Sequence, residues 1–79
     1  MVVVHRAFGL RFIIYIDDHE PAHVHVRGDG EARIILVGLD GKPELDYAVG
    51  MTGADKRRMM RACLEQQTML LDRWKDIHG

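Results

Sequence analysis

The fold is decided by Asp17-Asp18-His19-Glu20-Pro21-Ala22-His23-Val24-His25-Val26-Arg27, a polar turn followed by a short alternating strand. Side chains along a β-strand alternate between its two faces. Val24 and Val26 therefore share one face, and their apolar character assigns that face to a core. The histidines of this strand and Arg27 share the opposite face. The segment predicts a sheet with a buried side and a candidate functional site on its other side.

Strand signals continue on both sides of this segment. Alternating or β-branched runs, separated by glycine-containing turns, predict strands over residues 2–6, 10–16, 23–27 and 31–37, with a weaker one over 44–49. In the second run one face is strongly apolar and is the better core face; it carries Leu10, Phe12, Ile14 and Ile16. Gly28-Asp29-Gly30 predicts a tight hairpin connection between the third and fourth strands.

The apolar period changes after Thr52. Thr52 is a suitable helix N-cap, and Asp55 falls in the first turn, where negative charge suits the helix dipole. Apolar residues then recur at steps of three and four from Met60 to Ile77, which is typical of an amphipathic helix. We expect this helix to be either continuous or interrupted near Gln66-Gln67-Thr68.

These elements predict an α+β fold in a single domain spanning residues 1–79: an antiparallel β-meander of four or five strands with a C-terminal helix packed on one face. One helix covers only one face. The other face is expected to expose Ile13, Tyr15 and part of the 34–37 run, more apolar surface than a small monomer normally leaves in water. We therefore expect a homodimer or a small protein partner on that outer face.

Composition bounds the class of protein. A chain of 79 residues with 47% apolar residues is a small globular domain rather than a disordered one. Its single cysteine, Cys63, predicts a reducing compartment such as the cytoplasm and, lying in the apolar stripe, an inert buried thiol. No apolar run is long enough for a membrane span, and we expect no secretory signal.

The net charge of −1 argues against a strongly basic nucleic-acid binder. Four basic residues nevertheless cluster at the start of the predicted helix: Lys56, Arg57, Arg58 and Arg61. Such a cluster is usually a solvated helix face. The alternative is contact with RNA, DNA or an acidic partner.

The histidines suggest a metal site. His23 and His25 are two residues apart on one strand face, close enough for both to reach one ion, and His19 and Asp18 in the preceding turn could add further ligands. Two or three imidazole nitrogens with a carboxylate suit a divalent metal such as zinc. The alternative is that these histidines are exposed and bond only to loop carbonyls or water.

A catalytic interpretation needs no metal. His19, His23 or His25 could act as general acid or base, with Arg27 stabilising an anion, which is the chemistry of a small ribonuclease. Such a site requires a concave pocket. Trp74 and the methionines of the helix are expected to serve in core or interface packing.

The motif Asp18-His19-x-Pro21-x-His23-Val-His25-Val, followed by Gly28 and Gly30, resembles the signature of domain-of-unknown-function family 4160. The segment 70–74 is similar to the C-terminal helix of that family, so the resemblance covers nearly the whole chain. Ala22 stands where the family usually has a second proline.

The resemblance implies a small bacterial protein, often encoded beside another small domain in pairs similar to toxin–antitoxin modules. It points to Asp18, His19, His23 and His25 as the residues of interest. The leading expectation is a component of such a two-protein module that acts mainly through protein–protein interaction. The alternative is a small histidine-dependent, ribonuclease-like hydrolase, with or without a metal. A third expectation is a metal-stabilised module without chemistry.

Overall fold

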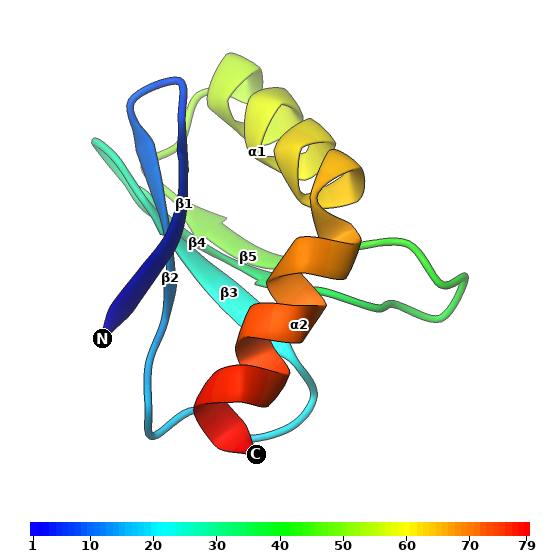
Figure 1. Ribbon diagram of the computed structural model, residues 1–79. Helices are drawn as coiled ribbons and strands as arrows, with labels where there is room; N and C mark the ends of the chain where they lie inside the picture. Colours follow the sequence, from blue (N-terminus) through cyan, green and yellow to red (C-terminus); the bar gives the residue numbers. More distant parts are fainter.

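The computed structural model describes all residues from 1 to 79. Five antiparallel strands follow one another in the order β1-β2-β3-β4-β5, and two helices cover one face of this sheet (Figure 1). The elements are β1 (Val2–Ala7), β2 (Leu10–Ile14), β3 (His23–Arg27), β4 (Glu31–Ile35), β5 (Glu44–Val49), α1 (Gly53–Glu65) and α2 (Gln67–His78). The predicted α+β meander is confirmed.

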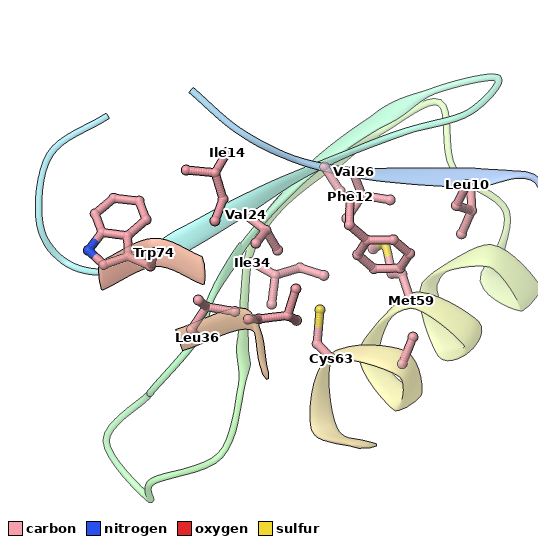
Figure 2. Packing of buried hydrophobic residues seen from close by; sticks show 13 residues of the cluster. Leu10, Phe12, Ile14, Val24, Val26, Ile34, Leu36, Met59, Cys63 and Trp74 are labelled. Atoms are coloured by element: carbon pink, nitrogen blue, oxygen red, sulfur yellow. The ribbon is translucent and has the colours of Figure 1, made fainter. Parts of the chain in front are cut away.

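The core lies between the sheet and the two helices (Figure 2). Val24 and Val26 of β3 are 0% exposed and point toward this core, as their alternation predicts. The remaining large members come from neighbouring strands and from both helices: Leu10, Phe12, Ile14, Ile34, Leu36, Met59, Cys63, Leu70 and Trp74. The sheet thus has one apolar inner face, and the histidines of β3 lie off it.

The hairpin between β3 and β4 depends on Gly30. A side chain at this position would collide with the backbone of Val49 and Gly50 at the end of β5. The turn closes when the Gly28 N–H donates to the Gly30 carbonyl, at 3.0 Å. Glycine at this position lets the β3–β4 turn lie close to the end of β5, where a Cβ would not fit.

The helical segment is interrupted as one of the two alternatives predicts. Thr52 caps α1, because its Oγ1 accepts the Asp55 N–H at 3.0 Å. Gln66, with φ −106° and ψ 16°, departs from helical geometry and separates α1 from α2. The neighbouring Gln67 side chain donates to the carbonyls of Leu36 and Gly41, at 2.8 and 2.9 Å. These two hydrogen bonds attach the start of α2 to the β4–β5 connection.

Two strand ends differ from the prediction. The second strand ends at Ile14 rather than Ile16, which is 66% exposed, because Asp18 Oδ2 accepts the Tyr15 N–H at 2.9 Å and starts a turn. The fourth strand ends at Ile35, although Leu36 still enters the core and Val37 is 47% exposed.

The prediction that Ile13 is exposed on the outer face is wrong. Ile13 is only 1% exposed, lying between Val3 and His25 of the neighbouring strands. The next positions across the same row are Arg33 and Tyr47, and Arg33 lies 3.3 Å from the carboxylate of Asp46. This row therefore combines the buried Ile13 with polar groups, and the exposed apolar side chains of this face lie on β5, where Tyr47 and Val49 are 39% and 60% exposed. Neither helix is long and apolar enough to cross a membrane.

Candidate functional site

Three polar side chains meet at the end of the sheet where β3 begins. Asp18 comes from the β2–β3 connection, and His23 and His25 come from the outer face of β3. One oxygen, Asp18 Oδ1, lies 3.4 Å from the Nε2 atom of each histidine. All three potential ligand atoms lie within 4.8 Å of one another. We call these three residues the Asp-His-His cluster.

The Asp18 carboxylate is oriented by its own turn. The Asp18 backbone N–H donates to the Tyr15 carbonyl at 3.1 Å, and Asp18 Oδ2 accepts the Tyr15 N–H at 2.9 Å. This leaves Oδ1 free to face the two imidazoles. Burial raises the pKa of Asp18, but the Tyr15 N–H and the positive forms of His23 and His25 outweigh it, so that the pKa lies below its ordinary value.

The His23 ring is fixed on both sides. Its side chain is only 3% exposed, and its centroid lies 5.1 Å from that of Trp74 and 5.2 Å from that of His25. Its Nδ1 lies 2.8 Å from the Pro21 carbonyl oxygen. Because a carbonyl only accepts, Nδ1 carries the proton and donates it, which leaves Nε2 facing Asp18.

His25 forms the more open side of the cluster. Its side chain is 21% exposed, and the Tyr15 ring packs against it edge to face, with centroids 4.8 Å apart. Burial lowers the pKa of His25 and outweighs the Asp18 carboxylate, which acts in the opposite direction. His23 and Arg33 lower the same pKa through their charge.

Two of the predicted site residues lie outside the cluster. His19 is exposed in the β2–β3 connection and is not among the residues whose ligand atoms meet. The Arg27 guanidinium is 49% exposed and pairs with Glu31 at 3.4 Å. The structure thus brings Asp18, His23 and His25 together and places the other two candidates elsewhere.

Sequence reasoning missed two residues that support the cluster. Tyr15 was assigned to the outer face without a role, although its parity with Ile13, opposite His25, was a usable signal. For Trp74 the sequence predicts packing in the core or an interface, with a ligand groove as the alternative, and no local pattern connects it with His23. The indole Nε1 also donates to Glu20 Oε1 at 3.3 Å, so Trp74 of α2 contacts both the β2–β3 connection and the first residue of β3. Figure 1 shows the end of α2 beside this connection.

The other candidate groups lie on or under α1. The basic cluster is exposed; Arg61 pairs with Glu65 at 3.1 Å, and the Arg58 guanidinium lies 5.6 Å from the centre of the Phe8 ring. Cys63 is 0% exposed, and burial raises the pKa of its thiol to about 12. The expectation of a buried, inert thiol agrees with this environment.

Two imidazole nitrogens and one carboxylate oxygen can do two kinds of chemistry. They can share a proton, with His25 as the group open to solvent, or they can bind a divalent transition metal. The ligand set is unsuited to magnesium or calcium, which prefer oxygen alone.

No curated protein and no solved structure matches the chain. The model of one protein family, described as a domain of unknown function (DUF4160), matches residues 9–75. The match covers all of the elements except β1 and the last residues of α2, and it includes the Asp-His-His cluster. The chain therefore belongs to the DUF4160 family.

Proposed function

We propose that this protein is one component of a bacterial, cytoplasmic two-protein module similar to toxin–antitoxin pairs, and that it acts mainly by binding its small protein partner. The chain belongs to the DUF4160 family, and the proposal is based on the gene pairing that the resemblance to this family implies. The structure supplies one observation in favour of a protein contact, on the connection between β4 and β5.

This connection presents apolar side chains from a fixed loop. In the connection itself, Leu39 is fully exposed, at 102%, and Val37 is 47% exposed. Leu64 of the adjoining α1 is 52% exposed. A hollow of about 260 Å³ lies beside the loop and is lined by Lys42, Pro43, Met60, Arg61 and Leu64. We call Val37, Leu39, Pro43, Met60 and Leu64 the loop surface. Figure 1 shows the connection projecting away from the sheet.

The loop is held by hydrogen bonds rather than by burial. Gly38 N–H donates to the Lys42 carbonyl at 2.7 Å, and Gly41 N–H donates back to the Gly38 carbonyl at 3.0 Å. Gln67 adds its two bonds from α2. Ordering a loop before binding lowers the entropy cost of association. An exposed leucine on a fixed loop therefore favours a contact with another protein.

Charge defines the kind of partner. Lys56, Arg57 and Arg58 lie exposed on α1 without a carboxylate within ion-pair distance, and only Arg61 of this cluster has one. The surface next to the hollow is therefore positive. It suits a partner segment that combines apolar side chains with acidic ones. RNA or DNA bound by the same four basic residues is the competing occupant.

Co-purification with the product of the adjacent gene tests the proposal. We expect a stoichiometric complex by size exclusion with light scattering, free of nucleic acid after nuclease treatment. Leu39→Asp combined with Leu64→Asp should weaken it at least about tenfold, which is a loss of about 1.4 kcal/mol. Ile16→Asp is the control, because Ile16 is also an exposed apolar residue, at 66%, and lies in a different connection.

Three results would count against this proposal. The chain could elute alone in the presence of the neighbouring product, either as a monomer or as a homodimer. The complex could also survive the double substitution at full strength, which would place the contact elsewhere. Complex formation that requires RNA or DNA would identify nucleic acid as the occupant of the basic cluster.

The Asp-His-His cluster favours a second candidate function, a small histidine-dependent hydrolase of the ribonuclease type. The hollows of the surface are lined by residues other than these three, so the wall of a substrate cleft would have to come from a second chain. Induced expression should then arrest growth and degrade RNA, and His25→Ala should abolish both effects while His19→Ala retains them. Undamaged RNA and normal growth with the wild-type chain would rule this candidate out.

A further inference from the structure

The separation of the atoms in the Asp-His-His cluster fits coordination of a single ion. Ligands bound tetrahedrally at about 2.05 Å stand about 3.3 Å apart. Asp18 Oδ1 lies 3.4 Å from His23 Nε2 and 3.4 Å from His25 Nε2. This is longer than a well-formed hydrogen bond between such atoms, whose usual length is about 2.7–2.9 Å. The spacing is close to that of neighbouring ligands around one metal.

The turn before β3 orients His23 as a ligand. Its Nδ1 lies 2.8 Å from the Pro21 carbonyl oxygen, and its Nε2 lies 3.4 Å from Asp18 Oδ1. Histidine ligands of metals commonly donate their other ring N–H to a carbonyl in this way.

Each of the three ligands is also oriented by a neighbour. The Tyr15 backbone N–H donates a hydrogen bond to Asp18 Oδ2, and the Tyr15 ring packs against His25. Trp74 packs against His23. Such supporting contacts keep ligands in place before the ion binds, which lowers the cost of binding.

Charge and exposure are compatible with a bound ion. Arg33 lies opposite His25 in β4, and its charge opposes a cation, but Asp46 pairs with it at 3.3 Å and offsets much of this effect. Asp18 and His25 are 14% and 21% exposed, whereas His23 is 3% exposed. An ion held by these three groups would keep one side open to water or to a fourth ligand.

We propose that Asp18, His23 and His25 form a binding site for one divalent transition metal, with zinc as the best match to two imidazoles and a carboxylate. Iron, cobalt and nickel share the preference for this ligand set, and magnesium and calcium do not. The site is independent of the loop surface, so it stands whether or not the partner proposal holds.

Calorimetric titration of the tag-free full chain, freed of metal with EDTA, tests the site with zinc chloride. We expect one zinc per chain and no competition from excess magnesium. Asp18→Asn and His25→Gln should each lower the zinc affinity at least tenfold. His19→Ala is the matched control and should bind as the wild type does, because His19 lies outside the cluster.

The variants avoid His23, whose buried ring is needed for packing. Circular dichroism checks that both variants keep the wild-type fold. If Asp18→Asn alters the spectrum, the zinc affinity of His25→Gln, which changes the more exposed ligand, is the deciding measurement. Absence of saturable zinc binding by the wild type, or undiminished binding by the folded His25→Gln variant, would overturn the proposal. Loss of binding in His19→Ala alone would equally overturn this choice of ligands.

Discussion

The imidazole of His23 and the indole of Trp74 pack with their ring centroids 5.1 Å apart, although one begins the central strand and the other lies in the last helix. The indole also stacks on the imidazole of His78, with ring centroids 3.9 Å apart. Trp74 is 4% exposed and belongs to the core cluster. Trp74 is therefore the side chain by which α2 contacts both the apolar core and His23 of the Asp-His-His cluster.

Trp74→Ala should destabilise the protein by about 3–5 kcal/mol, because a large buried ring is lost and the cavity is only partly refilled. In a domain this small that is much of the total free energy of unfolding. Trp74→Phe should cost less, about 1–2 kcal/mol, since an aromatic ring remains while the bond to Glu20 is lost. Urea unfolding followed by circular dichroism measures both. Equal losses in the two variants would contradict the assigned role of ring packing.

Gly30→Ala should destabilise the protein by more than about 2 kcal/mol, because the added Cβ would collide with backbone atoms of Val49 and Gly50, which cannot move independently of β5. Gly53→Ala is the matched control. Its Cβ would meet only the end of the flexible Arg57 side chain, and alanine is favoured over glycine in a helix by about 1 kcal/mol. We expect unchanged or increased stability there. A Gly30→Ala variant as stable as the wild type would show that β5 can shift.

Much of the fold could be predicted from alternation alone. Val24, Val26 and the core face of β2 follow the period of two, and Thr52 marks the start of the helical part. The end of β2 could not be predicted this way, because one hydrogen bond from Tyr15 to Asp18 stops an apolar run that continues to Ile16. The burial of Ile13 likewise depends on neighbours across the sheet.

Strand alternation also made part of the candidate site predictable. The spacing of His23 and His25 on one strand fixes their common face, and this places them together. Asp18 and His19 are adjacent in a turn, where strand periodicity gives no direction. The turn directs Asp18 toward the imidazoles and leaves His19 exposed. The contact with Trp74 depends on the break between α1 and α2, which sets the direction of α2.

Cys63 should react with alkylating reagents only after unfolding. With burial raising its pKa to about 12, only about one chain in ten thousand carries the thiolate at pH 8, and the side chain is also inaccessible. Iodoacetamide labelling followed by mass spectrometry should be negligible in buffer and rapid in urea. Because the reactive form is the thiolate, the residual native rate should rise about tenfold per pH unit while the fold persists. Fast native labelling at pH 8 would contradict the buried environment.

Trp74 should report metal binding by its fluorescence. The chain has a single tryptophan, and its ring lies against the proposed ligand His23. A paramagnetic ion such as cobalt(II) held by the Asp-His-His cluster should quench the emission, and EDTA should restore it. Zinc has a filled d shell, so it should occupy the site with little quenching and protect the emission against cobalt added later. His25→Gln should remove the saturable quenching, whereas His19→Ala should keep it. Quenching that survives in folded His25→Gln, or that zinc does not prevent, would place the cobalt ion elsewhere on the chain.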